Sequence, residues 1–258
     1  MAVTDIVGYA GMAETWATGA ALAYGPMAEH LVERAPVPLD GALALDAGAG
    51  SGVAGRAMRA RGARVVAADL EFDMAAFDAA AGPAVTADVT ALPFREGSFD
   101  VVTAAFVVNH LPDPAGGLAE LRRVTRPGGA VLASTFSGDR SAAKLAVDEV
   151  VAGYGFVAPD WYLDFRETAQ GFEDPDAVER AVAAAGFAAW TVTETAIDVG
   201  LGDPADVVRY RLGMPHLHRF AVGLTDDVRR ELFAEAVEAV RRTGERFAPL
   251  VVEAVATA

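Results

Sequence analysis

The sequence contains no cysteine, which excludes disulfides, thiolate metal sites and cysteine nucleophiles. No stretch reaches the roughly 18 uninterrupted apolar residues that a membrane-spanning helix needs. The opening residues, MAVTDIVGYAGMAETW, lack the basic segment followed by an apolar run that marks a signal peptide. We therefore expect a cytoplasmic protein that does not insert into a membrane.

Positive charge is scarce as well. The formal net charge of −15 disfavours a nucleic-acid backbone or an anionic membrane surface as the main partner. Lys144 is the only lysine, which we interpret as coding bias. Hydrophobic residues make up 53% of the chain and charged residues 22%, a balance typical of a globular protein. The 258 residues suit one domain, and a homodimer is compatible with this interpretation.

Strand-like and helix-like segments alternate from residue 41 to about residue 138. This order predicts an α/β fold in which a mostly parallel sheet is covered by helices on both faces. Strands are expected at residues 42–47, 63–70, 83–89, 98–108, 130–136, 188–199 and 248–258. Helices are expected at residues 9–34, 52–62, 72–82, 174–187, 203–213, 215–223 and 225–244, and a helix followed by a sharp turn at 114–129.

The segments outside this alternation are interpreted as additions to a single domain, residues 1–258. We expect a helical leader at 1–38, a ligand-binding core at 39–138 and cap elements at 139–172 and 203–245. Residues 138–172 are rich in aromatic side chains and show no clean period. Three Asp-Pro pairs, at Asp113, Asp174 and Asp203, are interpreted as helix caps, because proline suits the first turn of a helix.

The stretch GALALDAGAGSGVAGR, residues 41–56, joins a buried strand to a helix through closely spaced glycines. Such a turn brings backbone N–H groups and a helix N-terminus close to a ligand. Two registers are open. Residues 50–55 (GSGVAG) match the glycine pattern of nicotinamide and flavin binding, whereas residues 48–52 (GAGSG), preceded by Asp46, match a pattern in which an acid ends the strand.

Two acids further along the chain help to choose between the registers. Asp69 ends the second strand, 17 residues after Gly52, where a ribose hydroxyl of either cofactor would need a carboxylate acceptor. Asp88 ends the third strand, in TADVTALPF, where an adenine amino group would lie. The nicotinamide register leaves Asp88 and the later segment NHLPDP unexplained, so the second register is favoured.

The segments LDAGAGSG, AADL, ADVTALPFREGSFDVV, VVNHLPDP and ELRRVTRPGGAVLAST, in this order over residues 41–136, resemble the class I S-adenosylmethionine-dependent methyltransferases. The subgroup they resemble most contains the ubiquinone and menaquinone enzymes. The resemblance implies a Rossmann-like sheet of seven strands with an antiparallel last strand. It also implies that S-adenosylmethionine is the cofactor and that these residues bind it: Asp46, Gly48, Gly50, Gly52, Asp69, Leu70, Asp88, Val89 and Phe106.

The methyl acceptor is expected to be a small molecule bound near the cap elements. His110 and His216 are candidate general bases, while a loop or capping role for His110 and a solvated helix face at residues 209–219 are the alternatives. Trp161, Tyr162, Arg211 and His216 are candidate acceptor-binding residues. Aromatic residues of the leader, Tyr9, Trp16 and Tyr24, either close over the cofactor or serve packing.

Methyl transfer from a sulfonium is an in-line displacement that needs alignment of the two reactants and exclusion of water, and it needs no metal. The predicted function is therefore methyl transfer to a small-molecule acceptor. Two alternatives are a protein of the same fold that binds the cofactor for a non-methylating, cyclase-like reaction, and an NAD-linked oxidoreductase.

Overall fold

The computed structural model describes residues 11–77, 82–138 and 141–258. Seven strands form one sheet in the order β3-β2-β1-β4-β5-β7-β6. Their bounds are β1 Leu43–Ala47, β2 Arg64–Asp69, β3 Ala84–Thr86, β4 Phe99–Ala105, β5 Thr125–Phe136, β6 Ala189–Ala196 and β7 Leu250–Thr257. All neighbouring pairs are parallel except those of β7, which is antiparallel to both β5 and β6. The predicted Rossmann-like sheet with an antiparallel last strand is confirmed.

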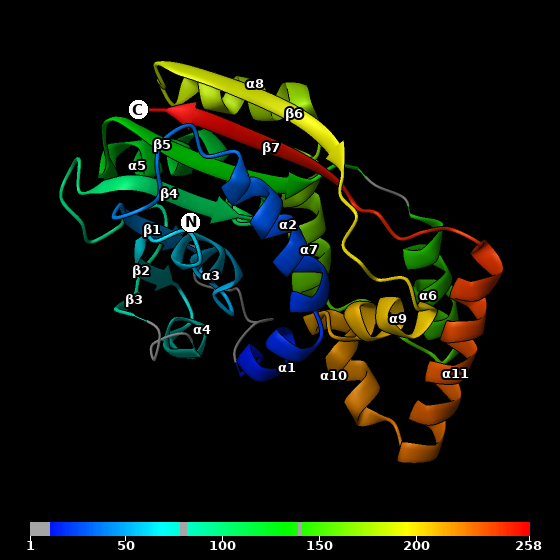
Figure 1. The fold of residues 1–258 in the computed structure, drawn as a ribbon. Coiled ribbons are helices and arrows are strands. Elements are labelled where there is room, and N and C mark those ends of the chain that lie inside the picture. The colour runs from blue at the N-terminus through cyan, green and yellow to red at the C-terminus, as the bar shows by residue number, and fades with distance from the viewer. Residues whose placement is uncertain (1–10, 78–81, 139–140) are drawn as a thin grey trace.

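Helices cover both faces of this sheet (Figure 1). The helices have these bounds: α1 Ala13–Thr18, α2 Ala21–Glu33, α3 Val53–Arg59, α4 Phe72–Phe77, α5 Pro114–Val124, α6 Ala142–Gly153, α7 Asp160–Gln170, α8 Pro175–Ala184, α9 Pro204–Leu212, α10 Pro215–Gly223 and α11 Asp226–Thr243. Side chains of neighbouring residues in a strand point into different hydrophobic cores, one on each face of the sheet. Val101 packs with α2 and α3, while Val102 packs with α5 and α8, so the strands are apolar on both faces.

The Asp-Pro prediction is confirmed at all three sites. The carboxylate of Asp113 accepts a hydrogen bond from the Gly116 N–H at 3.0 Å, and the proline that follows opens α5. Asp174 and Asp203 cap α8 and α9 in the same way. The carboxylates of these three aspartates therefore accept hydrogen bonds from backbone N–H groups at helix N-termini.

One expectation about local structure is wrong, and one segment without a prediction proves to be helical. Residues 126–129 (RPGG) lie within the bounds of β5 and not in a turn before it, because Thr125 already pairs with Phe99 and the register then shifts. The segment 138–172, for which the sequence predicts no helix or strand, contains two helices, α6 and α7. In α7 the only buried residue is Ala169, so no apolar stripe marks this helix in the sequence.

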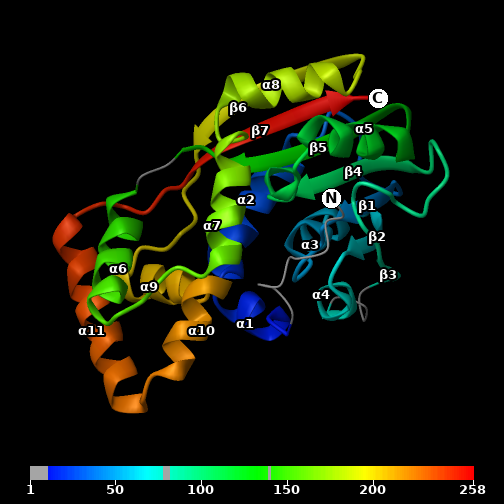
Figure 2. The ribbon, with the colours of Figure 1, turned by 180° about the vertical axis from the view of Figure 1, so that it is seen from behind.

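Helices α6, α9, α10 and α11 gather beyond the ends of the parallel strands, where the arrowheads of β4 and β5 point (Figures 1 and 2). They join the leader through one apolar core that contains Trp16 and Tyr24 from the leader and Val207 and Leu232 from α9 and α11. Within the described part of the chain, no helix has the length and apolar character needed to cross a membrane. We call α6, α9, α10 and α11, together with α7, the cap. The cap faces the edge of the sheet at which the predicted ligand-binding loops lie.

Candidate functional site

A cavity of about 830 Å³ lies between the carboxyl ends of the parallel strands and the cap. Its sheet half is lined by residues 48–50, 69–71, 87–89 and 105–107, which follow or end β1, β2, β3 and β4. Its cap half is lined from α6, α7, α9 and α10 by Ser141, Lys144, Leu145, Asp148, Tyr162, Phe165, Arg166, Ala169, Gln170, Tyr210, Arg211 and His216. The strand order reverses between β1 and β4, and open α/β sheets bind ligands at such a point.

The glycine-rich turn after β1 forms one wall of the sheet half. Gly48, Gly50 and Gly52 all have positive φ, at 71°, 54° and 77°, which disfavours any other residue. A Cβ on Gly48 would come within 2.3 Å of a methyl group of Val107. Gly48 and Gly50 line the cavity, whereas Gly52 lies behind the wall as the N-cap of α3.

Asp69 and Asp88 both line the sheet half, as do the predicted residues Leu70 and Val89. Asp69 is tied to the glycine turn, because its carboxylate accepts a hydrogen bond from the Gly50 N–H at 2.8 Å. Burial raises the pKa of this carboxyl, against the effect of its backbone hydrogen bonds. The Asp88 carboxylate accepts hydrogen bonds from the backbone N–H and the hydroxyl of Thr90, at 2.8 and 2.7 Å.

Asp46 faces away from the cavity. Its Oδ2 accepts a hydrogen bond from the Gly55 N–H at 2.7 Å, and its Oδ1 accepts one from the Thr103 hydroxyl at 3.0 Å. The residue is 2% exposed, and burial raises its pKa to about 6. Asp46 therefore joins β1, β4 and α3 behind the glycine turn. At Gly55, the last glycine of the alternative register, a Cβ would lie 3.0 Å from the Asp46 carboxylate, which would have to shift slightly to accept it.

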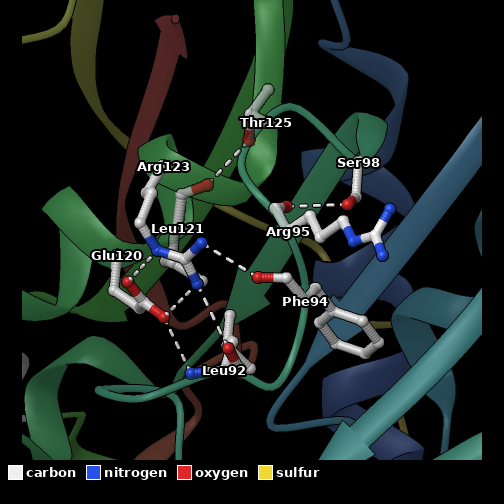
Figure 3. Close-up of polar contacts among 8 residues, drawn as sticks. All are labelled: Leu92, Phe94, Arg95, Ser98, Glu120, Leu121, Arg123 and Thr125. Carbon is white, nitrogen blue, oxygen red and sulfur yellow. Dashed lines mark hydrogen bonds and ion pairs between the residues drawn. The ribbon is translucent and has the colours of Figure 1, made fainter.

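The loop that follows Asp88 is joined to α5 by backbone hydrogen bonds to Glu120 and Arg123, which form an ion pair on that helix (Figure 3). The guanidinium of Arg123 donates hydrogen bonds to the carbonyls of Phe94 and Leu92, at 2.9 and 3.1 Å. Glu120 accepts hydrogen bonds from Arg123 at 2.6 and 2.7 Å and from the Leu92 N–H at 2.8 Å. The segment after β3 is thus attached to α5, a few residues beyond the part of it that lines the cavity.

Aromatic side chains close the junction between the two halves. Phe106, directly after β4, is the one non-glycine residue of the described chain with a positive φ, at 59°, and strained backbone of this kind clusters at ligand sites. Its ring lies 4.9 Å from the ring of Tyr24 and 4.6 Å from that of Phe136. Trp16 and Tyr24 also line the cavity, whereas Tyr9 lies outside the described residues.

Both predicted histidines line the cavity, and each stacks on a ring of α7. His110 lies on Phe165 with 4.5 Å between ring centroids, and burial lowers its pKa to about 4. His216 lies on Tyr162 at 3.7 Å and is 5% exposed. Burial, followed by the positive charge of Arg211, holds the pKa of His216 far below its usual range. Both imidazoles are therefore neutral at pH 7 and accept protons weakly.

The remaining predicted acceptor residues divide between cavity and surface. Arg211 lines the cavity, and its guanidinium donates two hydrogen bonds to Asp148, at 2.7 and 2.8 Å. Arg209 instead pairs with Asp206 at the surface. Trp161 does not belong to the cavity lining and packs edge-on against Tyr162. In the segment 209–219, Arg211 and His216 thus line the cavity, whereas Arg209 lies at the surface.

Sequence reasoning missed much of the cavity wall, and two of the missed residues could have been found from the sequence. Lys144, interpreted above as coding bias, lies in the first turn of α6, with its ammonium 5.2 Å from the centroid of the Phe136 ring. Asn109 is 6% exposed, and its side-chain oxygen has no hydrogen-bond partner among the described residues. The unique lysine was a usable signal, and so was the position of Asn109 directly before His110 at the end of the fourth strand segment.

Comparisons with known proteins agree with this geometry. Residues 45–133 match the sequence model of a family described as a methyltransferase domain. The chain is 34% identical over 152 residues to a demethylmenaquinone methyltransferase of Mycolicibacterium gilvum, covering 55% of this chain and 67% of that protein. It is 35% identical over 175 residues to the protein of the same name from Clavibacter sepedonicus, covering 60% of this chain and 69% of that one. The chain thus spans about two thirds of the length of these relatives.

Among solved structures, the fold is similar to that of Haemonchus contortus phosphoethanolamine N-methyltransferase 2 in complex with phosphomonomethylethanolamine and S-adenosylhomocysteine. The TM-score is 0.58 and the sequence identity 17%, and the similarity covers 90% of this chain and 52% of that one. At this level of identity the likeness is one of fold.

Proposed function

The chain belongs to the class I S-adenosylmethionine-dependent methyltransferases, and from this premise we propose that it transfers the methyl group of S-adenosylmethionine to a small molecule held in the cap half. The observation that carries this proposal is the two-part cavity at the reversal of strand order, with a glycine turn and carboxylates on one side and a helical cap on the other. The named relatives favour methyl transfer over a cyclase-like or NAD-linked reaction.

The residues of the sheet half fit S-adenosylmethionine, which supplies a methyl group on a positively charged sulfonium. Gly50 turns toward open space, since a Cβ there would meet only the Trp16 indole nitrogen within 4 Å, at 3.9 Å. The carboxylates of Asp69, Glu71 and Asp88 line this half, and their negative charge suits a cationic ligand.

We assign roles in this half by position. Asp69 is expected to accept hydrogen bonds from ribose hydroxyls beside Leu70, and Asp88 with Val89 is expected to hold the adenine. Gly48 and Gly50 lie where the methionine part would pass, with Phe106 at the edge. Asp46 and Gly52, which do not line the cavity, would support the turn from behind.

The cap half would align the acceptor and keep water from the reacting atoms. Alignment of two bound reactants can supply about 7–11 kcal/mol of a barrier. With both histidines neutral, acceptors whose nucleophilic atom needs little or no deprotonation suit this site best. The division into leader, core and cap elements, the cytoplasmic location and the homodimer stay predictions.

Calorimetry tests the cofactor assignment. S-adenosylmethionine and S-adenosylhomocysteine should bind in the micromolar range, at about −8 kcal/mol, and NADH should give no heat. Asp69→Ala should weaken cofactor binding by about 1.5–3 kcal/mol, the loss expected for a charged hydrogen bond. Asp174→Ala, which removes an exposed acid that caps α8, is the matched control and should leave cofactor affinity unchanged.

Activity is tested with labelled S-adenosylmethionine and a panel of small aromatic and apolar acceptors, by following the release of S-adenosylhomocysteine. Binding of NADH without binding of S-adenosylmethionine would contradict the proposed function. Equal cofactor affinity in wild type and Asp69→Ala would contradict the assigned pocket, even if methyl transfer were observed.

A further inference from the structure

We propose that His30 and Arg34 of α2 are positioning residues for the proposed methyl transfer. By neutralising the buried carboxylate of Glu253, they hold the leader helices α1 and α2 closed over the cavity. The inference rests on the proposed function in one respect, because it takes the sheet half as the site of S-adenosylmethionine. The cluster itself lies outside the cavity lining, and closure of the leader depends on its charges.

Glu253 is a charged residue in the middle of the sheet. It lies in β7 between Ser134 of β5 and Thr193 of β6, and it is 0% exposed. Neither the Ser134 hydroxyl nor the Thr193 hydroxyl has a hydrogen-bond partner among the described residues, so the neighbouring strands do not donate to the carboxylate. A carboxylate that is taken out of water needs a basic partner close by.

Within the described residues, the basic side chains that pair with this carboxylate both come from α2. The Nδ1 atom of His30 lies 2.9 Å from Oε1, and a guanidinium nitrogen of Arg34 lies 3.3 Å from Oε2. The side chains of His30 and Arg34 are 34% and 27% exposed. The two basic groups therefore reach water where they are, whereas the Glu253 carboxylate can reach it only if α2 moves off the sheet.

The same helix carries part of the cavity wall. Helix α2 runs from the cap onto one face of the sheet (Figure 1). Tyr24, about 9 Å before His30 along the helix axis, lines the cavity, and its ring lies 5.0 Å from that of Trp16 of α1 and 4.9 Å from that of Phe106. If α2 left Glu253, these two leader rings would leave the wall.

Apolar packing alone does not fix the place of α2. Leu31 and Val32 bury apolar surface on the same face of the sheet, but the hydrophobic effect has no direction and favours any nearby register. The two ion pairs with Glu253 are satisfied in one register only. They therefore select the position of α2 in which Tyr24 meets Phe106.

The test removes both basic partners and leaves the carboxylate. In the double variant His30→Phe with Arg34→Met, a docked α2 would bury Glu253 without a partner, so the helix should leave the sheet. Amide hydrogen exchange should rise in residues 21–33 and stay unchanged in β4. Calorimetry should show S-adenosylhomocysteine binding roughly tenfold more weakly, the loss expected when α2 is docked in about a tenth of the molecules.

Adding Glu253→Gln to the double variant separates charge from packing. Glutamine has nearly the size of glutamate and no charge, so α2 can dock again. Exchange and affinity should then return to within roughly threefold of wild type, because replacing a whole ion pair by neutral groups costs little. Glu33→Gln is the control, since Glu33 lies on the same helix and pairs at the surface with Arg61. It should behave like wild type.

Four results would overturn the inference: unchanged exchange of residues 21–33 in the double variant, an equal rise in β4, wild-type affinity despite raised exchange, or no rescue by Glu253→Gln. Failure of the proposed function looks different. A protein in which the exchange of α2 follows these charges, but in which no variant binds S-adenosylhomocysteine, would refute the proposed function. The role of His30 and Arg34 in docking the leader would stand.

Discussion

The buried carboxyl of Asp46 should make the protein less stable as the pH rises, and Asp46→Asn should remove that effect. Burial raises the pKa of this group from the ordinary 3.8 to about 6. The folded state therefore binds the proton more tightly than the unfolded state, and between pH 4 and 6 the unfolded chain loses its proton first. The free energy of unfolding falls through this interval by about 3 kcal/mol, since each pKa unit is worth about 1.4 kcal/mol.

Asparagine can keep both hydrogen bonds of Asp46. Its carbonyl oxygen can accept from the Gly55 N–H, and its amide can donate to the Thr103 oxygen, because the Thr103 hydroxyl can then donate to the Leu45 carbonyl, 3.3 Å away. At pH 7.5 the variant should be more stable than wild type by up to about 3 kcal/mol. For a domain of this size, 3 kcal/mol corresponds to about 6–12 °C in Tm.

The assay is urea unfolding at a series of pH values from 4 to 8, with the two proteins compared at each pH so that other titrating groups cancel. The difference in unfolding free energy should grow in favour of Asp46→Asn between pH 4 and 6 and then stay constant. An Asn variant that is less stable than wild type at pH 7.5 would refute the reasoning.

Because Asp46 does not line the cavity, the variant should also bind S-adenosylmethionine within tenfold of wild type. A larger loss would place its charge in cofactor binding.

Two more substitutions test the walls of the cavity. Gly48→Ala should cost about 1–3 kcal/mol of stability and abolish cofactor binding, because it adds a clash with Val107 to an unfavourable φ. Gly41→Ala is the control, because φ is 74° there and no atom lies within 4 Å of the added Cβ. In the same thermal melts it should show only the smaller cost of the unfavourable φ. Asp148→Ala should lower the free energy of unfolding by about 1–3 kcal/mol, less than for a fully buried ion pair because the Asp148 side chain is 37% exposed. The double variant Arg211→Met with Asp148→Leu should lose less stability than Asp148→Ala alone, because it leaves no unpaired charge. A double variant as unstable as Asp148→Ala in urea unfolding would contradict this account.

The sheet half could be predicted from the sequence because its residues are placed by short-range structure. Each follows a strand directly, and the carboxyl ends of parallel strands meet at one edge. Asp69, for example, pairs in register with Thr86 of β3, which brings Asp88 close without any further information. What the sequence does not specify is the direction of a side chain at such an end. Asp46 stands at the end of β1 like Asp69 at the end of β2, yet it faces α3 and Thr103.

The cap half could not be predicted in the same way because its contacts are long-range. Arg211 and Asp148 are 63 residues apart, and nothing in either segment alone indicates the pair. Helix α7 buries only Ala169, so its sequence lacks the apolar period by which helices are recognised. The rings that make Tyr162 and Phe165 useful in a cavity are the same ones that obscured the helix.

The acidic and basic residues that line the cavity are distributed unequally between its two halves. The carboxylates of Asp69, Glu71 and Asp88 line the sheet half, whereas the basic residues of the wall lie in the cap half. There Asp148 pairs with Arg211, and Glu173 lies 4.0 Å from Arg166. A sulfonium cofactor is attracted to the carboxylates of the sheet half. In a chain with a net charge of −15, the lysine and arginine side chains that the described residues contribute to the cavity wall all belong to the cap half.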